Sequence, residues 1–567
     1  MKYTYLIIAL FTAGIASAQK PVTNDQDQIA DAERKTAENR ANVAEPSVAS
    51  SNFNVNYYRC EWNIDPAVYY ISGTVTTYFK ITSKTNQVTM DLTKKLKVDS
   101  IKMRAQKLSF TQTTDDGLVI SLPKKYKKNE RDSFSIFYHG MPSTNGGAFT
   151  QTKHSGTPVI WTLSEPYGAK DWWPCRNGLD DKADSIDMYI THPSQYNASA
   201  NGLLISEKTS NGLTTSYYKH RYPIASYLVG IAVTNYSILH NSVQLGSKTL
   251  PVISYIYPES LSDFQSRTPL MLQAIPLYNS MYGEYAFINE RYGQTQFGWG
   301  GGMEHQTNTF ITSTNEDVMA HELAHQWFGD KITCASWQDI WLNEGFATYS
   351  ADFLYMKNFS PVYYPQYVSG DLNYIVSQPA GSVFVDDTSN FNRIFDSRLT
   401  YNKGAFLLRM LEWTMGSDTF FKGMQKYFTD PKIAYGFAHT SDFQRNMEAV
   451  SGLDLNYFFN QWFYGQGYPT FTVYWSQNAN NNVQLYIKQT TSHPSVNFFK
   501  VPLELVFKNG TQEKRITIDV NQKVQQTAVN IGFQATTLLI DPDMQIISKG
   551  NTVVKLGANA DTGPGGE

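Results

Sequence analysis

Residues 316–330 read E-D-V-M-A-H-E-L-A-H-Q-W-F-G-D and contain the pattern H-E-x-x-H. His321 and His325 are four residues apart, so on a helix both imidazoles leave the same face and can bind one ion. Zinc binds neutral imidazole nitrogen well. Glu322 lies between the two histidines, where a general base is needed to take a proton from water. The segment therefore predicts the zinc helix of a hydrolase.

A third protein ligand is expected, because a catalytic zinc site has three protein ligands and one open position. Downstream, W-L-N-E-G-F-A-T-Y-S offers Glu344, which follows His325 after eighteen residues. That separation is long enough for a turn and the start of a second helix. We therefore expect His321, His325 and Glu344 to hold one Zn2+ per chain. The alternative is a pair of surface histidines on an ordinary helix.

The zinc segment lies in the middle of a chain whose periodicity changes twice. Before residue 250, apolar residues alternate or run between turn residues, which is typical of strands, and the same texture returns after residue 465. Between those points the apolar spacing is mostly helical. With 567 residues, the chain is too long for one hydrophobic core. We predict a β-rich N-terminal domain over 52–250, a mainly helical catalytic domain over 251–465 and a β-sandwich over 466–555.

The two ends of the chain differ from these domains. Lys2, an apolar run at 6–15 and the small residues Ala16-Ser17-Ala18 have the pattern of a secretory signal peptide over 1–18. The apolar run is too short for a membrane anchor, so we expect a periplasmic or secreted protein without stable membrane insertion. Residues 19–51 should form a polar arm, and 556–567 a disordered, Gly-rich tail.

Charge and cysteine content exclude other classes. The net charge of −3 gives no basic excess for a partner bound through phosphates, so we expect no nucleic-acid partner. The cysteines Cys60, Cys175 and Cys334 allow at most one disulfide, and their irregular spacing does not fit a Cys-rich zinc module.

These motifs together resemble the aminopeptidase N family of gluzincin zinc peptidases, which also contains the leukotriene hydrolases. The resemblance rests on H-E-L-A-H-Q-W-F-G-D, on W-L-N-E-G-F-A and on segments described below, and it covers about residues 55–555. It implies a multidomain α+β fold with a saddle-like β domain, a thermolysin-like catalytic domain and a small β-sandwich. It also implies a zinc metalloaminopeptidase, a hydrolase that removes the N-terminal residue from peptides.

The segment G-G-M-E-H at 301–305 matches the family's Gly-x-Met-Glu-Asn exopeptidase motif, with the residues Gly301, Gly302, Met303 and Glu304 in register. Glycines let a substrate backbone approach closely. The resemblance implies that Glu304 binds the free α-ammonium of the substrate. His305 departs from the family, which usually has Asn there.

Two more segments carry family roles. In T-L-S-E-P-Y-G-A-K-D-W-W-P-C-R-N, Glu165 falls where the family places a second N-terminus-binding Glu or Gln. In T-Y-N-K-G-A, Tyr401 falls on the family's Tyr-x-Lys-Gly-Ala pattern, whose Tyr donates a hydrogen bond to the developing oxyanion. The resemblance therefore adds Tyr401 to Glu322 as a catalytic residue.

Three alternatives share the zinc motif. An enzyme like the leukotriene hydrolases would open an epoxide at the same site. A thermolysin-type endopeptidase would not need Glu304 and would cleave blocked peptides internally. A silent binding module would keep the fold without the chemistry. The complete residue set favours an aminopeptidase whose partners are peptides with a free N-terminus.

Overall fold

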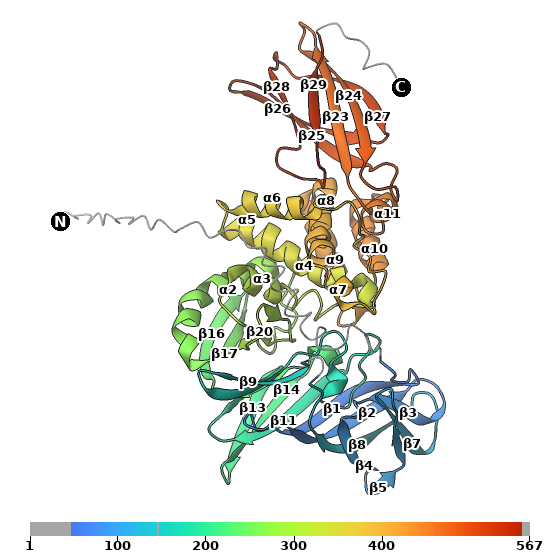
Figure 1. The fold of residues 1–567 in the computed structure, drawn as a ribbon, viewed down its shortest axis with the longest axis vertical. Coiled ribbons are helices and arrows are strands. Elements are labelled where there is room, and N and C mark those ends of the chain that lie inside the picture. Colours follow the sequence, from blue (N-terminus) through green and yellow to red (C-terminus); the bar gives the residue numbers. More distant parts are fainter. Residues whose placement is uncertain (1–46, 145–146, 558–567) are drawn as a thin grey trace, which may run out of the picture.

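The computed structural model describes residues 47–144 and 147–557 (Figure 1). The predicted signal peptide, most of the polar arm and residues 558–567 of the tail lie outside the described residues. The β-rich domain, the helical domain and the sandwich follow one another along the long axis of the molecule (Figure 1). This order confirms the predicted fold class. Among the described helices, none combines the length and the apolar character that crossing a membrane would require.

An eight-stranded sheet forms the base of the N-terminal domain, in the order β13-β14-β11-β1-β2-β8-β4-β5. β1 (Phe53–Asn63) pairs antiparallel with β2 (Ile71–Ile81) and parallel with β11 (Ser185–Pro193). Apolar side chains alternate along these strands and point into the core, as a half-buried sheet requires. The other strands are β4 (Leu96–Met103), β5 (Gln106–Leu108), β8 (Arg131–Gly140), β13 (Leu203–Ser210) and β14 (Leu213–His220).

Two smaller sheets complete this domain, in the orders β3-β7-β6 and β12-β15-β10-β9. Their strands are β3 (Thr85–Asp91), β6 (Phe110–Gln112), β7 (Gly117–Tyr126), β9 (Phe149–His154), β10 (Thr157–Thr162), β12 (Asn197–Ala200) and β15 (Ile231–Thr234). β10 is buried along its last four residues, and the chain leaves it directly toward Glu165. The loop that follows β10 of the second small sheet therefore carries one candidate site residue, Glu165.

A five-stranded sheet, in the order β16-β17-β18-β20-β19, joins the β-rich part of the chain to the helices. β17 pairs antiparallel with β16 and parallel with β18, so strands on both sides of residue 250 share one sheet. The predicted domain boundary at 250 thus falls inside β17, a strand that is paired on both sides. The strands are β16 (Ser237–Leu245), β17 (Lys248–Ile256), β18 (Gln294–Gln296), β19 (Gly302–Met303) and β20 (Thr309–Ile311).

The helical part surrounds the zinc segment. α4 (Glu344–Thr348) continues through a π-helical segment, Tyr349–Tyr355, and a second π-helical segment, Ser397–Lys403, leads into α8 (Gly404–Met415). The remaining helices are α2 (Leu261–Tyr282), α3 (Glu316–Ala324), α5 (Met356–Phe359), α6 (Tyr364–Ile375), α7 (Phe391–Ile394), α9 (Ser417–Thr429), α10 (Thr440–Ser451) and α11 (Asn456–Trp462). The short strands β21 (Thr333–Cys334) and β22 (Phe437–Ala438) pair in parallel.

The C-terminal domain is the predicted sandwich of a four-stranded sheet, β27-β24-β23-β29, and a three-stranded sheet, β26-β25-β28. Trp462 packs on Phe499 where α11 meets this domain, with ring centroids 4.3 Å apart. The strands are β23 (Pro469–Gln477), β24 (Asn482–Thr491), β25 (Val501–Asn509), β26 (Gln512–Val520), β27 (Val524–Asn530), β28 (Thr537–Ile540) and β29 (Thr552–Lys555). All three cysteines are buried and free of disulfides.

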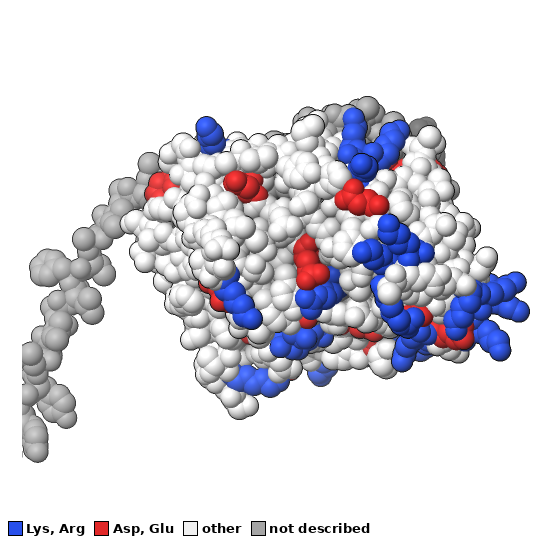
Figure 2. Space-filling model, turned by 90° about the horizontal axis from the view of Figure 1, so that it is seen from below, with Lys and Arg blue, Asp and Glu red and all other residues white. Residues whose placement is uncertain are grey.

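The surface charge is uneven. Figure 2 shows the lower face of the molecule, where Lys and Arg gather toward the side on which β3, β4 and β7 lie in Figure 1. The exposed lysines of this part of the chain are Lys84, Lys94, Lys95, Lys97, Lys107, Lys124, Lys125, Lys127 and Lys128. The carboxylates of the candidate site are buried instead, so basic surface and acidic site are separate features.

Candidate active site

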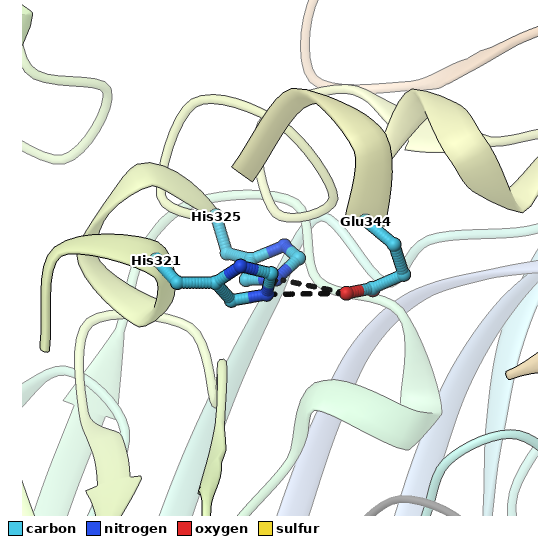
Figure 3. Close-up of side chains that lie close together, drawn as sticks. All are labelled: His321, His325 and Glu344. Carbon is cyan, nitrogen blue, oxygen red and sulfur yellow. Dashed lines mark hydrogen bonds and ion pairs between the residues drawn. The ribbon is translucent and has the colours of Figure 1, made fainter. Parts of the chain in front are cut away.

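The three predicted metal ligands converge between α3 and α4 (Figure 3). His321 Nε2 lies 3.2 Å and His325 Nε2 lies 3.4 Å from Glu344 Oε2, and the two Nε2 atoms are 3.0 Å apart. Tetrahedral zinc with bonds of about 2.0–2.1 Å separates its ligand atoms by about 3.4 Å. All three side chains are buried. The donor atoms and their spacing therefore fit a zinc ion.

Local structure fixes the two histidines. The Asn315 side chain accepts a hydrogen bond from Asp317 N and caps the start of α3. His325 follows the last helical residue but keeps helical angles, φ −57° and ψ −24°, so the four-residue spacing still places both rings on one face. His325 Nδ1 donates to Phe328 O at 2.9 Å, because a carbonyl oxygen can only accept. This bond leaves the Nε2 lone pair for a metal.

Two glycines bring Tyr401 close to the metal ligands. A Cβ on Gly345 would lie 3.0 Å from the Gly404 backbone, so α4 and α8 touch where neither residue has a side chain. Tyr401 belongs to the π-helical segment before α8, and such segments are frequent at functional sites. Its ring stacks against His321 with centroids 6.1 Å apart. The structure thus places Tyr401 beside the metal ligands.

The exopeptidase motif lies against Glu322. Gly302 and Met303 form β19, and a Cβ on Gly302 would overlap the Glu322 carboxyl group. Oxygen atoms of Glu304 and Glu322 and a ring nitrogen of His325 lie within 4.8 Å of one another. The motif glycine therefore lets the chain that carries Glu304 pass directly over the candidate general base.

Glu165 reaches the same place from the N-terminal domain. Oxygen atoms of Glu165, Glu304 and Glu344 all lie within 4.8 Å of one another, and the three side chains are buried. Glu165 begins a cis peptide bond with Pro166. One loop of the N-terminal domain therefore contributes to the site, together with two parts of the catalytic domain.

Burial sets the electrostatics of these carboxyl groups. Burial raises the pKa of Glu304 to about 7, and the nearby Glu344 carboxylate adds to this shift. Burial, followed by repulsion from Glu304, also raises the pKa of Glu165 well above its usual range. The pKa of Glu322 is raised well above its usual range as well, chiefly by burial. Each group would ionise more readily with a cation beside it.

Sequence reasoning missed two residues that hold the exopeptidase loop. Thr307 has a left-handed backbone, φ +64°, which a β-branched residue rarely adopts. Its N–H donates to Gln326 Oε1 at 2.8 Å, and its hydroxyl accepts from Gly202 N at 2.7 Å. Gln326 directly follows His325, so it links the zinc helix to the loop. Its position next to a ligand was the only sequence signal for this role.

His305, the departure from the family motif, is accommodated by a glycine. The side chain is fully buried, its ring centroid lies 4.2 Å from that of Phe310, and a Cβ on Gly230 would overlap it. Burial lowers the pKa of His305 to about 3, so the ring is neutral. His305 therefore packs as an uncharged ring and adds no charge beside Glu304.

Comparisons with known proteins agree with this architecture. Residues 54–228 match the Peptidase M1 N-terminal domain, and residues 303–462 match the Peptidase family M1 domain; together these matches span more than half of the chain. The second match contains all three candidate zinc ligands and Tyr401. The chain belongs to peptidase family M1.

Two curated relatives are similar over the same region. The chain is 30% identical over 424 residues to aminopeptidase A of Gloydius brevicauda, covering 69% of this chain and 42% of that protein. It is 27% identical over 396 residues to glutamyl aminopeptidase of Homo sapiens, covering 64% and 39% respectively. The chain thus spans about two fifths of the length of these relatives.

Solved structures share the fold. An M1 zinc metallopeptidase from Deinococcus radiodurans aligns with a TM-score of 0.64 at 24% identity, covering 73% of this chain and 94% of that one. The same metallopeptidase bound to a Tyr-Ser-Ala substrate aligns with a TM-score of 0.63 at 23% identity, covering 73% and 94%. The fold of this chain is therefore that of an M1 metallopeptidase.

Proposed function

We propose that this protein is a zinc-dependent aminopeptidase that hydrolyses the first peptide bond of peptides with a free N-terminus. One observation carries the proposal: the candidate amine-binding carboxylates Glu165 and Glu304 lie within 4.8 Å of the zinc ligand Glu344. In a peptide, the N-terminal nitrogen and the carbonyl carbon of the same residue are about 2.5 Å apart. An ammonium held by these carboxylates thus brings the first carbonyl, and no later one, to the metal site.

The chain's own residues have distinct tasks in this reaction. His321, His325 and Glu344 would hold a zinc ion, which would supply a Lewis acid to polarise the carbonyl and lower the pKa of water to about 7. Glu322 takes the proton of the attacking water and passes it to the leaving amine.

Two further interactions complete the mechanism. The Tyr401 hydroxyl donates a hydrogen bond to the oxyanion that develops on the scissile carbonyl, where charge stabilisation is largest. Glu304 and Glu165 pair with the ammonium, a charge-assisted contact that also orients the substrate. Because these groups are buried, water is excluded from the ammonium contact.

The names of the relatives and one bound peptide support an aminopeptidase over an epoxide hydrolase. The curated proteins are named aminopeptidase A and glutamyl aminopeptidase, and one structural neighbour holds the peptide Tyr-Ser-Ala. A peptide substrate fits the carboxylate arrangement of this chain, whereas an epoxide has no ammonium for Glu165 and Glu304 to bind.

An aminoacyl-anilide assay on the full chain, with and without a chelator, tests the proposal. We expect hydrolysis that a chelator abolishes and added Zn2+ restores, with N-acetylated anilides left intact. Cleavage of blocked internal peptide bonds would indicate an endopeptidase. A zinc-loaded protein without turnover on any aminoacyl anilide would indicate a silent binding module.

We also propose export through the signal sequence of residues 1–18, on the basis of Lys2, the apolar run at 6–15 and Ala16-Ser17-Ala18. Cell fractionation and N-terminal sequencing test this proposal. The expected mature protein begins at Gln19 outside the cytoplasm, and a cytoplasmic protein that retains residues 1–18 would contradict it.

A further inference from the structure

Beside the zinc triad lies a second group of potential cation ligands. Glu165, Glu304 and Glu344 each offer a carboxylate oxygen, and these atoms lie within 4.8 Å of one another. The three side chains come from the loop after β10, the loop after β19 and the start of α4. All three are at most 1% exposed. A buried set of acidic ligands from three separate segments is thus already assembled.

Glu344 belongs to both groups of ligands. Its Oε2 atom lies 3.2 Å from His321 Nε2 and 3.4 Å from His325 Nε2, which is the zinc side. Its Oε1 atom is buried and has no hydrogen-bond partner among the described residues. A carboxylate in this position can bridge two cations, one on each oxygen.

Glu304 is the strongest sign that a cation belongs here. Both of its oxygens are buried, and within the described part of the chain neither has a hydrogen-bond partner. A buried carboxylate is normally paired with a cation or with hydrogen-bond donors. The oxygens of Glu304 are therefore coordination positions that the protein itself leaves open.

The charge around the site is strongly negative. Among the described residues, no Lys or Arg forms an ion pair with Glu304, Glu322 or Glu344. One zinc ion carries two positive charges, whereas Glu304, Glu322 and Glu344 carry three negative charges when all are ionised. Further positive charge would balance this site, and an all-oxygen ligand set suits a hard divalent cation such as Mg2+, Mn2+ or Ca2+.

We propose that Glu165, Glu304 and Glu344 form a second, weaker divalent-cation site next to the zinc site, occupied when substrate is absent. This inference rests on the proposed function in one respect: the substrate ammonium would bind the same carboxylates and displace the cation. The cation is then a competitor of the substrate. Raising its concentration increases KM for free-amine substrates and leaves kcat unchanged.

Mn2+ is a suitable probe, because the paramagnetic resonance signal of the free ion falls when the ion binds. The zinc-loaded full chain is titrated with Mn2+; zinc stays with the two histidines, because imidazole ligands favour it over Mn2+. We expect one bound Mn2+ per chain. The variants Glu165→Gln and Glu304→Gln should weaken binding by roughly tenfold or more, since each removes one of three ligands.

A surface variant, Glu284→Gln, is the matched control, because this side chain is 61% exposed and forms an ion pair with Lys248 instead of contributing to the cluster. Its Mn2+ affinity should equal that of the parent protein, and zinc content and thermal unfolding should be unchanged in all variants. Absence of Mn2+ binding at millimolar concentration, or equal binding in Glu165→Gln, Glu304→Gln and the parent, would overturn the proposal.

Displacement tests whether cation and amine share the site. Leucinamide should release bound Mn2+, and N-acetyl-leucinamide should not. If neither compound releases Mn2+, the shared site is refuted. Mn2+ binding is measured without turnover, so a protein that hydrolyses no aminoacyl anilide but binds Mn2+ through Glu165 and Glu304 would refute the proposed function and leave the cation site standing.

Discussion

The two halves of the candidate site are built in different ways. The metal-binding half consists of α3 and α4, where helical spacing and two short segments position His321, His325 and Glu344. The amine-binding half consists of irregular backbone, with Gly301 at φ +61° and Thr307 at φ +64°, and it includes a loop from another domain. Helices position the candidate metal ligands, whereas long-range contacts assemble the candidate amine-binding carboxylates.

This difference predicts different kinetic effects. Changes in the metal-binding half should lower kcat, because they remove interactions made in the transition state. Changes in the amine-binding half should mainly raise KM for free-amine substrates and relax the discrimination against blocked ones. The variants below test this division, from the largest expected effect to the smallest.

Glu322→Gln removes the candidate base while keeping the size of the side chain. We expect kcat to fall by about 10²–10⁴-fold, the range that general acid–base catalysis contributes. Zinc content, measured by metal analysis, should be unchanged. Near-normal turnover in a zinc-loaded variant would exclude Glu322 as the base.

Tyr401→Phe removes one hydroxyl from the π-helical segment and keeps the ring that stacks against His321. Loss of one oxyanion donor should lower kcat by about 10²–10³-fold. Steady-state kinetics should show little change in KM. A variant that changes only KM would place Tyr401 in substrate binding instead.

Glu304→Ala tests the amine-binding half. The variant should raise KM for aminoacyl anilides by roughly tenfold or more, because a buried charge-assisted contact is lost. The ratio of rates on free and N-acetylated substrates should move toward one. Glu448→Ala, on α10, is a control that should leave kcat and KM unchanged.

Gln326→Met removes the acceptor for the Thr307 N–H and leaves that buried donor unpaired. We expect a loss of about 1–3 kcal/mol in the free energy of unfolding and a few-fold rise in KM, since the loop that carries Glu304 loosens. Gln326→Glu keeps an acceptor oxygen, so its KM should lie close to that of the parent protein. Equal KM values in both variants and the parent would separate Gln326 from substrate positioning.

The metal-binding half could be predicted from sequence because its information is local. A four-residue spacing on a helix determines that His321 and His325 share a face, and the mostly helical spacing predicted for 251–465 agrees with α8, α9 and α10. The two histidines therefore needed no knowledge of tertiary structure, whereas Glu344 required the expectation of a second helix. Glu165 and Tyr401 entered through family resemblance alone, because nothing in their local spacing distinguishes them.

The remaining features depend on contacts that sequence periodicity does not encode. The sheet that spans residue 250 depends on parallel pairing of β17 with β18, which lie on either side of α2. The backbone of Thr307 depends on acceptors and donors supplied by Gln326 and Gly202. The lack of a hydrogen-bond partner for Glu344 Oε1 among the described residues likewise depends on the packing around it.

The most direct test of the central claim uses two copies of one peptide, one with a free N-terminus and one acetylated. The zinc-loaded protein is incubated with each, and the products are followed by mass spectrometry. We predict stepwise loss of single residues from the N-terminus of the free peptide and an intact acetylated copy. Internal cleavage, or equal cleavage of both copies, would contradict the assignment of Glu304 and Glu165 to the substrate amine.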